Sequence, residues 1–162
     1  RAAAVSNEAR RRWRVTGTDL LATLAAALPV DLFGIGAERV HLDGVRPRGD
    51  LPAGRLHAAM ARRRVYLHPV RWTSLGLSLL EAMHLGMPVV ALATTEVVEA
   101  VPPDAGVIST RVDALARALR ELGGDPERAR VLGKHARGAA VARYGLGRFL
   151  ADWDRLLEEV TG

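Results

Sequence analysis

The segment Val70–Leu77 combines residue types that suit anion binding. It reads Val-Arg-Trp-Thr-Ser-Leu-Gly-Leu and leads directly into a stretch with helical spacing. A hydroxyl at Thr73 or Ser74 can cap the helix start, where free amides and the helix dipole favour phosphate. Gly76 lets a ligand approach the backbone closely, and Arg71 could add a forked pair of donors. The segment predicts a phosphate site, with a plain helix cap as the simpler interpretation of the hydroxyls.

Glu81 lies about two turns into the same helix. At helical period it shares a face with residues 74, 77, 78 and 85. A carboxylate in this position can accept hydrogen bonds from two neighbouring hydroxyl groups, such as those of a ribose. Periodicity alone supports a solvent-exposed carboxylate equally well.

Short apolar runs alternate with helical stretches along the whole chain. Strands are predicted at residues 3–6, 30–36, 40–44, 65–69, 88–92 and 106–109, and a loop at 47–49. Helices are predicted at 18–28, 51–63, 75–85, 96–100, 112–122, 126–144 and 148–160. This alternation predicts one Rossmann-like α/β domain over residues 1–162, with a parallel sheet flanked by helices. Ligands of such sheets bind beyond the carboxyl ends of the strands, which places the turn after Pro69 at the site.

The last helix carries a broad apolar stripe, formed by Phe149, Leu150, Trp153, Leu156, Leu157 and Val160. An ordinary core-facing stripe is the simpler interpretation. The alternative is that the helix, at residues 146–160, packs on another domain of a longer protein. The chain begins with Arg1 rather than Met, so we expect it to be part of such a protein.

The composition argues against several classes of function, among them nucleic-acid binding, thiolate metal binding and membrane spanning. The formal net charge is +5, and the positive charge gathers at Arg10–Arg14 and Arg62–Arg64. Only 4% of the residues are aromatic, which disfavours a nucleic-acid-binding face. The absence of cysteine excludes disulfides and thiolate metal sites and fits a cytoplasmic location. The five histidines are scattered, and no apolar run has the roughly 18 residues needed to span a bilayer. We therefore expect neither a metal site nor a transmembrane segment.

Residues Val65–Leu92 resemble the donor-binding signature of retaining GT-B glycosyltransferases. The family pattern is an apolar strand, Pro, Glu-Gly-Phe-Gly-Leu, a helix ending Leu-Glu-Ala-Met, and Gly-x-Pro-Val-Val. The chain matches it at Leu80–Met83, Gly86 and Pro88–Val90. The similarity extends from about Val30 onward and is of a family-4-like, actinobacterial type. It implies that the chain is the C-terminal, nucleotide-sugar-binding half of a GT-B fold.

The resemblance also implies roles for individual residues. Glu81 would bind the ribose hydroxyls, and the amides of Leu75, Gly76 and Leu77 would meet the diphosphate and sugar. The loop after Gly44, with Val45 and Arg46, is where the base is expected.

The chain departs from the family pattern at two positions. Thr73 stands where the family has its first glutamate, which leaves the sugar and the mechanism open. Thr16 stands where the family often has a phosphate-binding lysine. We expect Arg11 and Arg14 to supply the missing positive charge, with Arg12 as a third option.

The leading hypothesis is transfer of a sugar from a nucleoside-diphosphate sugar to an unidentified acceptor, without a metal or other cofactor. The N-terminal half of the same protein would supply the acceptor site, so this chain alone would bind the donor without turnover. One alternative is a related module that has lost catalysis and serves in binding. A second is a basic nucleic-acid-binding α/β domain, which the scarcity of aromatic residues disfavours.

Overall fold

A six-stranded parallel sheet forms the centre of the molecule, and its strand order is β3-β2-β1-β4-β5-β6. The structure is a computed structural model that describes residues 1–161. The strands are β1 Ala2–Val5, β2 Val30–Phe33, β3 Val45–Gly49, β4 Val65–His68, β5 Val89–Leu92 and β6 Gly106–Ser109. This is the strand order of a doubly wound Rossmann sheet, in which the chain reverses its direction of travel beside β1. The predicted single α/β domain is confirmed.

Helices cover both faces of the sheet, as the buried strands require. Ala2 and Ala4 of β1 point into a core shared with α1 (Thr18–Ala25) and α5 (Val112–Gly124). Ala3 points to the opposite face, whose core involves four helices. These are α2 Ala53–Met60, α3 Leu77–His84, α4 Val97–Ala100 and α6 Pro126–Tyr144.

The edge strand β3 corrects two predictions. Residues 40–44, predicted as a strand, follow a short 3₁₀ helix (η1, Ala37–Arg39) and form a turn, and the predicted loop at 47–49 lies inside β3. Pro47 pairs with Leu32 of β2 and has no strand on its other side. A proline is tolerated there because an edge strand donates hydrogen bonds on one side only.

Helix α3 ends as its sequence predicts. Gly86 has a φ of 73°, a left-handed conformation that glycine adopts without strain. Its amide donates to the Met83 carbonyl and the Met87 amide donates to the Ala82 carbonyl, which is the Schellman arrangement. This ending turns the chain directly into β5.

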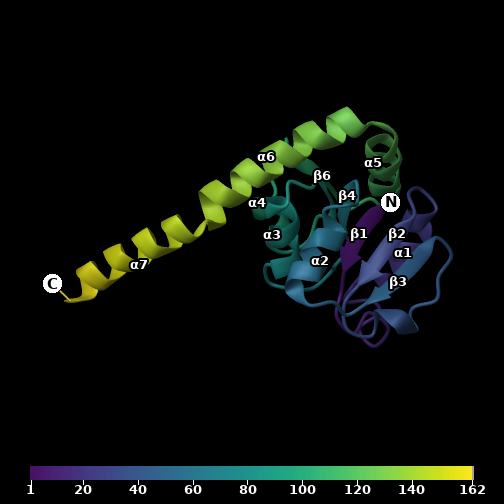
Figure 1. The fold of residues 1–162 in the computed structure, drawn as a ribbon, viewed down its shortest axis with the longest axis horizontal. Coiled ribbons are helices and arrows are strands. Elements are labelled where there is room, and N and C mark those ends of the chain that lie inside the picture. The colour runs from purple at the N-terminus through teal and green to yellow at the C-terminus, as the bar shows by residue number, and fades with distance from the viewer. Residues whose placement is uncertain (162) are drawn as a thin grey trace.

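Helix α7 (Leu146–Thr161) continues from α6 and projects away from the rest of the molecule (Figure 1). None of its described residues is buried, and Phe149, Trp153 and Leu157 are about half exposed. The core-facing interpretation of its apolar stripe is therefore wrong for this chain. Within residues 1–161, no helix is both long and apolar enough to cross a membrane.

Candidate functional site

The loop between β1 and α1 is held against the end of β4. Gly17 has a φ of 69°, and a Cβ atom there would lie 1.9 Å from the Pro69 carbonyl oxygen, so no larger residue fits. The hydroxyl of Thr18 donates to the Ala9 carbonyl at 3.0 Å and lies 2.8 Å from the Thr16 hydroxyl. The loop is therefore fixed at the carboxyl edge of the sheet, and buried Thr16 has a structural role within it.

The start of α3 faces the same edge of the sheet. The helix begins at Leu77 with Gly76 as its N-cap, and no side chain caps it, so the predicted caps at Thr73 and Ser74 are wrong. The helix starts late because residues 71–76 form bends. Among the described residues, no group accepts a hydrogen bond from the amides of Gly76, Leu77 or Ser78. These amides are free to bind an anion.

A cleft of about 170 Å³ lies between this helix start and the β1–α1 loop. We call it the carboxyl-edge cleft. It is lined by Val5, Ser6, Asn7, Arg12, Thr16, His68, Val70, Trp72, Thr73, Gly76 and Ser78. Its size suits part of a ligand, since whole small-molecule pockets usually measure about 300–1,000 Å³. Of the described residues that line it, Arg12 is the one that carries a charge.

Two polar side chains of the cleft are buried without partners. His68 is 2% exposed, and neither of its ring nitrogens has a hydrogen-bond partner among the described residues. The hydroxyl of Ser6 is in the same state. Burial lowers the pKa of His68 to about 4, so the ring is neutral at pH 7. From the sequence, the position of His68 at a strand's end allows it to line the site, with a packing role as the simpler interpretation. Ser6 carries no comparable signal beyond its position at the end of the first predicted strand.

Glu81 lies half-exposed on α3, one turn beyond the cleft residue Ser78. Its Oε1 atom is 3.5 Å from Nε2 of His57, which belongs to α2. The carboxylate is therefore beside the carboxyl-edge cleft rather than among the residues that line it. It is accessible to a ligand that extends along α3 from the cleft.

Two of the arginines that the sequence singled out, Arg71 and Arg11, form ion pairs outside the cleft. Arg71 makes a two-pronged ion pair with Asp19, at 2.6 and 2.8 Å, and also donates to the Arg14 carbonyl. The Asp19 partner raises the pKa of Arg71 further, and the Arg71 side chain lowers the pKa of Asp19. Arg11 is exposed, pairs with Glu8 and lines a separate hollow.

Arg12 therefore replaces Arg11 and Arg14 as the arginine that faces the cleft. In this loop Glu8 has a φ of 58°, and the Arg12 amide donates to the Glu8 carbonyl.

Some of the remaining predicted site residues line the carboxyl-edge cleft, and others lie outside it. Thr73 and Gly76 line the carboxyl-edge cleft. Leu77 is 75% exposed at the first turn of α3, and Leu75 packs against the core. Ser74 is exposed, and its carbonyl accepts from the Thr95 hydroxyl.

Val45 and Arg46 were expected in a loop. The structure instead places them at the start of strand β3, where they pair with Val30 and Asp31. They therefore lie at the amino edge of the sheet, and it is Gly49 that ends the strand at the carboxyl edge. The expected base-binding position at Val45 and Arg46 is wrong on these grounds.

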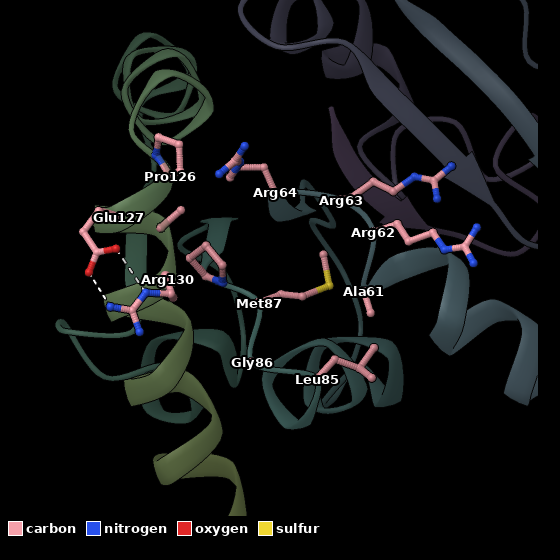
Figure 2. A pocket seen from close by; sticks show the side chains of 12 residues that line it. Ala61, Arg62, Arg63, Arg64, Leu85, Gly86, Met87, Pro126, Glu127 and Arg130 are labelled. Carbon is pink, nitrogen blue, oxygen red and sulfur yellow. Dashed lines mark hydrogen bonds and ion pairs between the residues drawn. The ribbon is translucent and has the colours of Figure 1, made fainter.

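A larger cavity, of about 440 Å³, opens at the amino edge of the sheet (Figure 2). It is lined by residues 61–64, before β4, residues 85–88, before β5, and the start of α6. Arg130 pairs with Glu127 on its wall, whereas Arg62 and Arg63 point away from it (Figure 2). Size alone does not make it the functional site, because ligands of open parallel sheets bind at the other edge.

Comparison with known structures defines the class of fold. The chain is similar to sucrose-phosphate synthase from Thermosynechococcus elongatus, with a TM-score of 0.82 and 22% identity over 99% of this chain and 45% of that one. It is also similar to Anabaena HepE in complex with UDP, with a TM-score of 0.79 and 17% identity over 98% and 48% of the two chains. A mutant of Staphylococcus aureus TarM in complex with UDP and other ligands is similar with a TM-score of 0.79 and 16% identity, over 96% of this chain and 34% of that one. The fold is that of one half of a GT-B glycosyltransferase.

The sequence identifies the family. Residues 37–139 match the family of group 1 glycosyl transferases, so the chain belongs to that family. No curated protein matches the chain significantly. The chain spans less than half the length of each of the three structures described above.

Proposed function

We propose that this chain is the donor-binding domain of a glycosyltransferase and binds a nucleoside-diphosphate sugar. The observation that carries the proposal is the uncapped start of α3, whose free amides face a cleft containing Arg12. Free amides, a helix dipole and a guanidinium group together suit a diphosphate. The site lies at the carboxyl edge beside the β1–β4 switch point, where doubly wound folds bind nucleotides.

In the proposed reaction, the departing nucleoside diphosphate carries the charge that develops as the sugar bond breaks. The amides and Arg12 are in place before the reaction and stabilise this charge without reorganising. Glu81, next to the cleft, would accept hydrogen bonds from the two ribose hydroxyls. Thr73 lines the cleft where the family pattern has a glutamate, so it would offer the sugar a hydroxyl in place of a carboxylate. Retention of configuration, as in the family-4-like enzymes, is part of the proposal.

Calorimetric titration with UDP, GDP and ADP tests this proposal. One nucleotide is expected to bind, and UDP is the first choice because two of the similar structures contain it. Glu81→Ala should weaken binding by about 1–3 kcal/mol, the cost of losing hydrogen bonds to a charged group. Glu127→Ala, at the amino edge, is the matched control and should bind like the unaltered chain. Equal affinities for the Glu81 variant and the unaltered chain would contradict the ribose role.

We also propose that the acceptor site belongs to another domain of a longer protein and that α7 packs against that domain. Within residues 1–161, no side chain of the apolar stripe of α7 is buried, and the chain spans under half of the similar structures. Residues 146–160 would then bury their apolar side chains on the acceptor-binding half. The 162-residue chain should bind donor without transferring sugar.

Hydrogen exchange tests the role of α7. The amides of Phe149 and Trp153 should exchange rapidly in the 162-residue chain and become protected in the longer protein. Amides of the central strand β4 should be protected in both and serve as the control. Rapid exchange of α7 in the longer protein would show that the stripe stays uncovered.

A binding module without catalytic activity is the second candidate, and the favouring observation is Thr73 in the cleft. Sugar transfer by the longer protein would exclude it.

The structure does not support the nucleic-acid alternative, which needs one continuous basic face. Arg10–Arg14 lie in the loop after β1 and Arg62–Arg64 lie before β4, so the two basic clusters occupy opposite edges of the sheet.

A further inference from the structure

The floor of the carboxyl-edge cleft contains a buried histidine without a hydrogen-bond partner in residues 1–161. His68 ends strand β4 and is 98% buried, since only 2% of it is exposed. Both ring nitrogens lack a hydrogen-bond partner among the described residues, as does the buried hydroxyl of Ser6 at the end of β1. Buried polar groups are normally paired, because leaving them unpaired costs stability. Two such groups in one cleft indicate that a ligand completes them.

The imidazole ring lies directly beneath the start of α3. A Cβ atom on Gly76 would lie 3.1 Å from Cε1 of His68 and 3.6 Å from Nε2, so this edge of the ring faces the helix N-cap. The ring is stacked on Tyr66, with 6.0 Å between the ring centroids. The Tyr66 hydroxyl donates to Oγ of Ser78, in the first turn of α3, at 2.8 Å. These contacts fix the ring next to the free amides.

The chemistry of these groups selects the kind of ligand atom. A neutral imidazole always carries one N–H donor, and the Ser6 hydroxyl supplies another. The adjacent amides of Gly76, Leu77 and Ser78 are donors as well. Arg12 is the one charged residue lining the cleft. A cluster of donors with one positive charge and no carboxylate suits an oxygen atom that only accepts hydrogen bonds and is negatively charged.

We propose that His68 and Ser6 bind a phosphate oxygen of the nucleoside diphosphate, His68 through an imidazole N–H and Ser6 through its hydroxyl. The proposal rests on the proposed function, because it assigns two further residues to the same donor site. His68 thus extends the anion site from the helix start down to the floor of the cleft.

Calorimetry on variants of the 162-residue chain measures the contribution of each group. UDP, GDP and ADP are titrated in parallel with uridine, guanosine and adenosine. His68→Leu should weaken binding of the preferred diphosphate by roughly 10- to 100-fold, the usual cost of losing a hydrogen bond to a charged group. Its nucleoside should bind as it does to the unaltered chain. His68→Gln, which keeps an N–H donor, should recover most of the loss, and Ser6→Ala should lose about tenfold.

Nuclear magnetic resonance on the unaltered chain gives a readout that a packing role would not move. Without ligand, the His68 ring should stay neutral from pH 8 down to about pH 5, because burial lowers its pKa to about 4. A bound diphosphate should raise this pKa, because its negative charge favours the imidazolium form. The nucleoside alone should leave the titration unchanged.

The outcomes separate the two proposals. If the diphosphate binds in a Glu81-dependent manner but the His68 variants and the titration are unaffected, the assignment of His68 is overturned and the proposed function stands. If no diphosphate binds the unaltered chain, both are overturned. A loss that is equal for diphosphate and nucleoside would show that His68 only supports the structure.

Discussion

The two edges of the sheet treat buried polar groups in opposite ways. At the amino edge, buried Asp31 of β2 accepts hydrogen bonds from both Arg63 and Arg1. Desolvation raises the pKa of Asp31, but the hydrogen bonds from Arg63 and Arg1 outweigh it and leave the pKa below its usual value. At the carboxyl edge, the ring nitrogens of buried His68 and the buried hydroxyl of Ser6 have no partner among the described residues.

This difference separates a polar network that is closed within the protein from polar groups that we propose a ligand completes. The carboxylate of Asp31 is satisfied within the protein, and Arg63 also lies over the Phe33 ring, 5.4 Å from its centroid. Such a closed network stabilises the fold and leaves nothing for a ligand. We therefore propose the smaller carboxyl-edge cleft, at about 170 Å³ against 440 Å³, as the binding site, because its buried polar groups have no partner among the described residues.

The largest expected effect lies at the amino edge. Arg63→Met removes the main partner of a buried carboxylate, so the free energy of unfolding should fall by about 3–5 kcal/mol. Urea denaturation measures this. The affinity for the nucleotide should stay unchanged at temperatures where the variant is folded. Arg62→Met, at an exposed neighbour, should change stability by less than about 0.5 kcal/mol. Equal effects of the two substitutions would mean that the Asp31 network is not a separate structural unit.

The second-largest effect is expected on acidification, because His68 at the carboxyl edge and Asp31 at the amino edge lose their contributions to stability at different pH. The pKa of His68 is about 4 in the folded chain and 6.5 when unperturbed, so protons bind preferentially to the unfolded state. Stability contributed by neutral His68 is complete above pH 6.5 and is lost as the pH falls toward 4, by about 3 kcal/mol. Asp31, whose pKa is lowered, loses its contribution only at still lower pH, as the carboxylate is protonated. The measurement is urea denaturation from pH 7.5 to 4.5, in which His68→Gln should flatten the slope.

The third prediction concerns the arginines of the β1–α1 loop. Arg12→Met should weaken nucleotide binding by about 1.5–3 kcal/mol, because Arg12 lines the carboxyl-edge cleft. Arg11→Met is the matched control and should have almost no effect, since Arg11 is exposed and pairs with Glu8. Calorimetry on the two variants gives the answer. The reverse order of effects would show that the loop reorganises when the nucleotide binds.

The smallest effect is expected for Arg71. Its ion pair with Asp19 is partly exposed, with about 30% of each side chain accessible, so Arg71→Met should lower stability by less than about 1 kcal/mol. Nucleotide affinity should hardly change, because the guanidinium group is held by Asp19. A double-mutant cycle with Asp19→Asn measures the pair. A loss of affinity as large as that for Arg12→Met would place Arg71 in the binding site after all.

Much of the fold could be predicted because its signals are local. Apolar four-residue runs alternate with amphipathic helices, and the glycine after α3 ends the helix where the sequence predicts. The secondary structure predicted for residues 40–49 was wrong because the edge strand β3 is largely exposed and contains a proline. It therefore lacks the apolar pattern by which a strand is predicted. The exposure of α7 also escaped prediction, since an apolar stripe does not show whether a partner is present.

The sequence by itself determined the parallel sheet, the glycosyltransferase family and the helix that begins after Gly76 and carries Glu81. These follow from periodicity and from a contiguous motif, both of which are properties of neighbouring residues. Only the tertiary structure decided that Arg12 faces the cleft and that Arg71 pairs with Asp19, which lies 52 positions earlier in the chain. It also decided that His68 lies under Gly76 with no hydrogen-bond partner in the part of the chain that the structure describes. The reason is physical: contacts between distant segments decide which polar groups are satisfied and which remain free for a ligand.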